Sequence, residues 1–93
     1  MIEIYGIELE ESGDKKLMGL FAHAFRKYQH SVQDVVWSKE QDVFLSRKMA
    51  FLEGQVTALA AALDMDSDIL DRVLNKTVSV AFRDYEALMG KRP

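Results

Sequence analysis

A seven-residue repeat of apolar side chains between Ser38 and Leu63 constrains the fold of this chain more than any other feature. Its members follow one another at alternating spacings of four and three residues: Leu45, Met49, Leu52, Val56, Leu59 and Leu63. At this spacing the side chains form one stripe along a single helix. A second row stands one position earlier, at Phe44, Phe51 and Ala58, and makes the apolar face wider than a paired coil needs. The pattern predicts a helix over 39–63 inside a helical bundle.

Two more helices are predicted, one before and one after this stretch. Residues 14–36 repeat apolar side chains at three- and four-residue steps after the capping sequence Ser12-Gly13-Asp14. Residues 67–89 do the same, and Gly90 is a typical stop. Within this segment the β-branched residues of 77–82 leave a strand as the alternative. A Ser-x-x-Gln capping box at Ser38–Gln41 predicts the corner between the first two helices.

The first twelve residues are predicted to be extended, as an arm or a strand. Residues 2–9 alternate between apolar and polar, but the parity changes at Gly6, which predicts a bulge or a turn there. A strand needs a hydrogen-bonding partner. Three possibilities remain open: the same strand in a second copy, an edge elsewhere in the chain, or an arm that lays its Ile and Leu side chains on the bundle.

The composition is that of a small globular protein. The chain has 93 residues, a net charge of −3, no cysteine and a single proline at its last position. We therefore expect one helical domain over 1–93, without disulfides or thiolate metal ligands. No apolar run approaches the ~18 residues that span a bilayer. The predicted fold is an all-α, three-helix antiparallel bundle with two long helices and a short extended N-terminal arm, in a soluble cytoplasmic protein without a membrane partner.

The length of the middle helix predicts self-association. A helix of ~25 residues is ~37 Å long, which is more than a compact domain of this size needs. A bundle of this kind leaves part of the wide apolar face uncovered, and a second copy covers it most simply. The sequence predicts a homodimer whose interface contains Phe44, Leu45, Met49, Phe51, Leu52, Val56 and Leu59.

Residues 59–75 resemble the helix-turn-helix of transcriptional repressors. The resemblance rests on Leu59 and Ala60 in a first helix, a turn at Asp64-Met65-Asp66, and Leu70 and Val73 in a second helix. It implies DNA binding through Arg72, Asn75 and Lys76. However, Asp64 replaces the usual glycine of the turn, and three aspartates stand where phosphates would lie, at positions 66, 68 and 71. DNA affinity depends on cations that meet the backbone.

Two other patterns have ordinary structural explanations. Asp64-x-Asp66-x-Asp68 opens like a calcium loop, but Ile69 and Asn75 occupy the positions of the required glycine and glutamate, so helix capping is the better interpretation. His23 and His30 are seven residues apart, which is too far for one metal ion without other ligands. The segment from His23 also resembles a histidine phosphotransfer site, although a partly buried histidine beside Phe21 and Phe25 is the favoured prediction.

The cations of the first predicted helix are the candidate partner-binding residues. They are Lys15, Lys16, Arg26, Lys27 and His30, and the segment 26–30 combines basic and aromatic side chains. No phosphate-binding loop or nucleophile motif occurs, so we predict no catalytic residue, no metal and no cofactor. The predicted function is that of a small non-enzymatic interaction or regulatory protein, which acts as a homodimer by binding another protein. The alternative is a DNA-binding regulator with the degenerate motif at 59–75.

Overall fold

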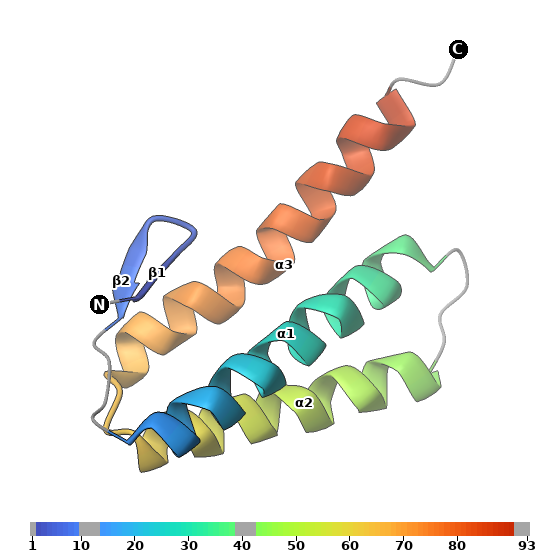
Figure 1. Ribbon diagram of the computed structural model, residues 1–93. Coiled ribbons are helices and arrows are strands. Elements are labelled where there is room, and N and C mark those ends of the chain that lie inside the picture. The colour runs from blue at the N-terminus through green and yellow to red at the C-terminus, as the bar shows by residue number, and fades with distance from the viewer. Residues whose placement is uncertain (1, 10–13, 39–42, 91–93) are drawn as a thin grey trace.

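Three packed helices and an N-terminal hairpin form the molecule (Figure 1). The computed structural model describes residues 2–9, 14–38 and 43–90. The elements follow in the order β1 (Ile2–Ile4), β2 (Ile7–Leu9), α1 (Lys15–Trp37), α2 (Val43–Ala62) and α3 (Ser67–Gly90). This architecture confirms the predicted all-α bundle with a short N-terminal arm.

The ends of α1 lie close to the predicted positions. Asp14 is the N-cap, and its Oδ1 accepts a hydrogen bond from the backbone N–H of Leu17 at 3.1 Å. The helix ends at Trp37, and Ser38 follows in an extended conformation. Residues 39–42 are outside the described part, so most of the predicted capping box lies there, and α2 is described from Val43 onward.

The connection between α2 and α3 is a Schellman turn. Asp64 adopts the left-handed conformation with φ at +55°. The N–H of Met65 donates to the carbonyl of Ala60 at 3.0 Å, and the N–H of Asp64 donates to that of Ala61 at 3.1 Å. Asp66 then caps α3, because its Oδ1 accepts from the N–H of Asp68 at 2.9 Å. The predicted capping role of the aspartate cluster is therefore confirmed at Asp66.

Helix α3 continues without interruption through residues 77–82, so the strand alternative for this segment is wrong. The 3.6-residue period decides the outcome, because it places Val73, Thr77 and Ala81 on the buried side of the helix. Thr77 fits this position because its hydroxyl donates to the carbonyl of Val73 at 2.9 Å.

The N-terminal segment pairs with itself. Strands β1 and β2 are antiparallel, with Ile4 opposite Ile7, and the turn between them consists of Tyr5 (φ +54°) and Gly6 (φ +79°). Two positive φ values are typical of the type I′ hairpin turn. This turn explains the change of parity and confirms the turn predicted at Gly6. The partner of each strand is the other half of the same segment, which was not among the three possibilities that the sequence left open.

The hairpin is attached to the helices at two points. Gln29 of α1 donates from Nε2 to the hydroxyl oxygen of Tyr5 at 2.7 Å. Leu9 of β2 is buried in the core, and β2 packs against α3. The hairpin therefore covers part of the bundle on the side where α3 lies (Figure 1).

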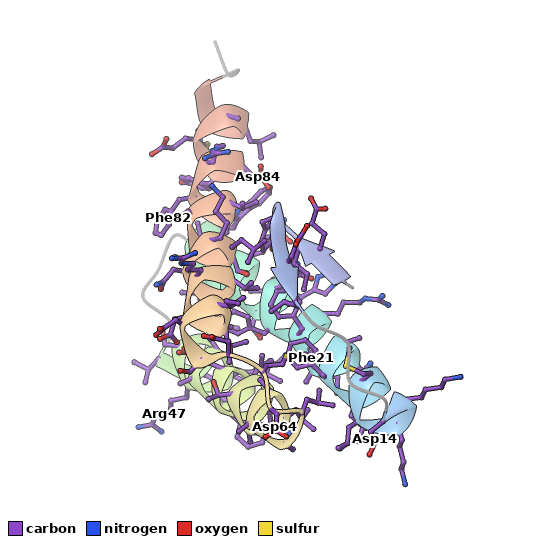
Figure 2. The ribbon with its side chains drawn as sticks, turned by 90° about the vertical axis from the view of Figure 1, so that its left-hand side faces the viewer. Asp14, Phe21, Arg47, Asp64, Phe82 and Asp84 are labelled. Carbon is purple, nitrogen blue, oxygen red and sulfur yellow. The ribbon has the colours of Figure 1, made fainter. Side chains whose placement is uncertain are left out.

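The apolar stripe of α2 is internal, as its period predicted. Leu52, Val56 and Leu63 are buried, and the other three members are half-buried: Leu45, Met49 and Leu59. Phe21 of α1, which Figure 2 labels, is 1% exposed and belongs to the same core. Helix α1 packs against both α2 and α3.

The molecule is elongated, with principal extents of 50 × 28 × 20 Å and a radius of gyration of 14.4 Å. A compact chain of this length has a radius of gyration of about 12 Å. The difference follows from the arrangement in Figure 1, in which α3 runs along one side of the α1–α2 pair.

Candidate functional site

A groove runs between α1 and α2. It consists of two hollows of about 370 and 490 Å³, and both are lined by Lys27 and Gln55. The first hollow is completed by Leu20, His23, Ala24, Ala58 and Leu59. The second is completed by His30, Ser31, Asp34, Lys48, Phe51 and Leu52. Because the hollows share two residues and no α3 residue lines either of them, we treat them as one groove.

The helical period explains why the groove faces away from α3. Along α1, Leu20, Lys27 and Asp34 recur every seven residues and therefore lie on one line of the helix. The buried residues Phe21 and Tyr28 follow these positions by one residue, which corresponds to a rotation of about 100°. The core side and the groove side of α1 are thus neighbouring faces of the same helix.

Large apolar side chains remain in water along this groove. Phe51 is 65% exposed and Leu20 is 48% exposed, and the half-buried Leu59 lies in the same groove. Single exposed apolar residues are common on protein surfaces, but apolar residues gathered in a concave strip are typical of a binding site. The groove therefore has the shape and the floor of a site that receives another apolar surface.

Positive charge surrounds the apolar floor. Lys27 stands where the two hollows meet, and Lys48 stands on the α2 side. His23 and His30 add two basic side chains on α1, and all four are exposed. Among the described residues, the acid that lines the groove is Asp34. The groove is thus cationic in a chain whose net charge is −3.

The seven residues predicted for a dimer interface do not form one free surface. Leu52 and Val56 are 4% and 0% exposed, because the chain's own helices cover them. Val56 has no surface left for a second copy, and Leu52 retains only the small exposed part that lines the second hollow. Leu45, Met49 and Leu59 are half-buried, whereas Phe44 and Phe51 are largely exposed. Self-association through α2 stays a prediction.

Of the five predicted partner-binding cations, two line the groove and three lie elsewhere on α1. All five are exposed: Lys15, Lys16, Arg26, Lys27 and His30. Lys27 and His30 line the groove, whereas the other three do not. Sequence reasoning missed Lys48 and Gln55. The signal was present, because Phe44, Lys48, Phe51 and Gln55 follow one another at spacings of four and three along α2.

His23 corrects an expectation. It is exposed and lines the groove, whereas Phe21 and Phe25 are buried in the core. The prediction of a partly buried histidine beside these phenylalanines is wrong, because two residues along a helix turn a side chain through about 200°. The distance of two helical turns between His23 and His30 also agrees with separate positions along the groove.

The DNA-binding residues that the helix-turn-helix resemblance implies lie on α3, and none of them lines the groove. Arg72 and Asn75 are exposed and Lys76 is half-buried. Asp68 and Asp71 are exposed on the same first turns of α3, so this surface presents carboxylates beside its cations. Within the described ranges, no group of three acidic, histidine or cysteine side chains is placed to hold a metal ion.

A second apolar area lies towards the C-terminal end of α3. Trp37 and Tyr85 meet edge to face with 6.3 Å between ring centroids. Phe82 and Leu88 are 52% and 44% exposed. Figure 2 shows Phe82 on the side of α3 opposite the hairpin. Neither residue lines a hollow of the groove, so this area is separate from the candidate site.

Comparison with protein-family models, with curated proteins and with solved structures finds no match to this chain. None of the described helices combines the length and the apolarity required to cross a membrane. The groove is therefore interpreted from its own chemistry.

Proposed function

We propose that this protein acts by binding another protein and that the partner binds in the groove between α1 and α2. The observation that carries the proposal is the concave apolar strip, in which Leu20 stays in water with Leu59 in the first hollow and Phe51 stays in water in the second. Burial of apolar surface stabilises a complex by about 25 cal/mol per Å². An exposed strip of this kind therefore favours association.

The form of the groove supports a macromolecular ligand. It extends along two antiparallel helices and involves residues from Leu20 to Asp34 on α1. Small-molecule sites enclose most of the surface of their ligand and hold it with a few convergent polar groups. An open strip between two helices instead matches the mode in which a groove receives an extended apolar face. We assign the groove a binding role and no catalytic step.

A second copy of the chain is the competing occupant, because the apolar face of α2 is wide enough to suggest a homodimer. The two uses of the groove are mutually exclusive if they involve the same side chains. A test must therefore report both where the partner binds and whether it is another copy.

Site-specific photocrosslinking in the native cell meets this requirement. p-Benzoylphenylalanine in place of Gln55 lies on the groove floor, and the same group in place of Asp71 on α3 is the matched control. We expect a discrete adduct with a different protein from position 55 and none from position 71. Leu20→Asp should abolish the adduct, because it puts a charge into the apolar strip.

Two results contradict the proposal. One is the absence of any adduct at position 55. The other is an adduct at position 55 that consists of two copies of this 10.6 kDa chain, which would assign the groove to self-association.

A further inference from the structure

We infer that the occupant of the groove is an amphipathic helix with acidic flanks, contributed by a different protein. This inference deepens the proposed function and rests on it. Three observations carry it: the length of the groove, the small side chains of its floor and the charge of its rim.

The length of the groove fits a helix of three to four turns. From Leu20 to Asp34 the axis of α1 advances about 21 Å, which equals the length of a helix of about 14 residues. A rod laid between α1 and α2 packs as a helix does in a bundle, with its side chains between the rows of the other two. The groove thus offers the space of a missing helix of the bundle.

Small side chains make room for the backbone of such a helix. Ala24 of α1 and Ala58 of α2 both line the first hollow. Side chains of this size allow closer approach of two helices than leucine or phenylalanine would. The larger Phe51 lines the second hollow and can pack against an apolar side chain of the incoming helix.

The charges around the groove select the flanks of the incoming helix. Lys27 and Lys48 stand on the two walls and carry the positive charge of the groove. Opposed by Asp34 alone among the lining residues, they favour a helix with Glu or Asp beside its apolar face. Such carboxylates would stand three or four residues from the apolar anchors.

The same charges disfavour a second copy. If this face met its own counterpart, two copies each of Lys27 and Lys48 would enter one interface with two copies of Asp34, which leaves an excess of positive charge. Like charges that face each other across an interface are destabilising. The buried face of α3 is likewise not an available ligand, because Leu70, Val73 and Leu74 are already covered in the core.

A displayed peptide library tests the inference with a defined probe. The peptides are about fifteen residues long. They carry fixed leucines at helical spacing and flanks randomised among Glu, Lys, Gln and Ala. Selection on the wild-type chain should enrich Glu at the flanks. A selected acidic peptide should bind at least about fivefold more tightly than its version with lysine flanks, as expected for ion pairs at a rim.

Charge reversal provides the decisive comparison. In the variant Lys27→Glu/Lys48→Glu the preference should invert, so that the peptide with lysine flanks binds more tightly. The matched control is Arg72→Glu/Arg83→Glu, which makes the same change of net charge on exposed residues of α3 outside the groove. It should keep the preference of the wild type. Circular dichroism establishes that each variant is folded.

Four outcomes would overturn the inference. Flanks enriched in neither acid nor base, with binding still lost in Leu20→Asp, would leave a protein-binding groove without the proposed selectivity, so the proposed function would stand. Sedimentation equilibrium that shows a dimer dissociated by Leu20→Asp would assign the groove to a second copy. Binding to phosphatidylglycerol vesicles, lost in Leu20→Asp and unmatched by any peptide, would assign it to a lipid surface. If no peptide is selected and position 55 gives no crosslink, both proposals fail.

Discussion

The two sides of the α1–α2 pair are built from neighbouring rows of the same helices, yet the structure covers only one of them. On α2, Leu52 is 4% exposed and Val56 is 0% exposed, whereas Phe51 is 65% exposed. Adjacent residues such as Phe51 and Leu52 differ by a rotation of about 100° around the helix. Apolarity alone therefore does not decide which row becomes core. The packing of α2 against α1 and α3 decides it.

The polar content of the two rows differs in a corresponding way. The covered row of α2 is apolar throughout, from Leu45 to Leu59, although Leu52 and Leu59 also line the groove. The open row interrupts its aromatic residues with Lys48 and Gln55, and Lys27 faces them from α1. These polar groups keep the open side hydrated in the unbound chain. At the same time they give it a charge that a partner can recognise.

The largest difference in the free energy of unfolding is expected between two variants that place a carboxylate on the two sides, Val56→Asp on the covered side and Phe51→Asp on the open side. Val56→Asp buries a charge in the core and should destabilise the fold by at least about 3 kcal/mol, which is much of the stability of a small domain. Phe51→Asp changes an exposed side chain and should alter the free energy of unfolding by no more than about 0.5 kcal/mol. Urea unfolding followed by circular dichroism measures both.

An equal loss in the two variants would break the comparison. It would mean that Phe51 is covered in solution, and a concentration-dependent unfolding midpoint would identify a second copy as the cover. Phe51→Leu serves as the control, because it keeps an apolar side chain at the same position.

The sequence predicted the covered side well and the open side poorly. The repeat from Leu45 to Leu63 was sufficient to predict a buried stripe, because a helical period reports which residues share a face. Three features depend on geometry that a period does not contain. They are the hairpin turn at Tyr5, the groove with Lys48 on its wall, and the burial of Leu52 and Val56 by the same chain instead of by a copy.

The hairpin illustrates the physical reason. The parity change in residues 2–9 predicted a bulge or a turn at Gly6, but it did not decide between the two or predict that Tyr5 adopts φ +54° and that the two halves pair with each other. Likewise, the basic residues of α1 were visible in the sequence, but their division between the groove and open surface depends on where α2 packs. Local patterns specify faces, and tertiary packing specifies which faces meet.

Tyr28 is expected to give the covered side a dependence on alkaline pH. Burial raises the pKa of Tyr28 to about 12, and the carboxylate of Glu53 and the hydroxyl of Tyr5 add to this shift. The unfolded chain, with a pKa near 10, loses its proton first. Between pH 10 and 12 the folded state therefore holds more protons, and stability falls as pH rises, by at most about 1.4 kcal/mol per pH unit.

Unfolding of the wild type and of Tyr28→Phe over this pH range isolates the effect. Tyr28→Phe keeps the ring in the core, and it should lose less stability than the wild type between pH 10 and 12. If the free energy of unfolding falls equally steeply with pH in the two proteins, groups other than Tyr28 cause the loss of stability at alkaline pH.

Gln29 and Lys27 compare the two sides of α1 within a single helical turn. Gln29→Ala removes the hydrogen bond to the Tyr5 hydroxyl and should cost about 1 kcal/mol. Lys27→Ala, on the groove side, should change stability by less than about 0.5 kcal/mol. A cycle with Tyr5→Phe shows whether the loss in Gln29→Ala comes from this bond, because the two losses should then not add.

Substitution of Asp64 is expected to change the free energy of unfolding least. Asp64 lies in the turn between α2 and α3. Its φ of +55° suits glycine, and the Cβ of an aspartate makes this conformation less favourable. Asp64→Gly should raise the free energy of unfolding by about 0.5 kcal/mol, since the flexibility of glycine in the unfolded chain offsets part of the gain. Asp64→Val, whose branched side chain fits this region worst, should lower it. If Asp64→Gly stabilises the fold and leaves peptide affinity in the groove unchanged, the turn at Asp64 contributes to the packing of α3 and has no effect on the groove. A parallel change in affinity would show instead that the position of α3 sets the width of the open groove through α1 and α2.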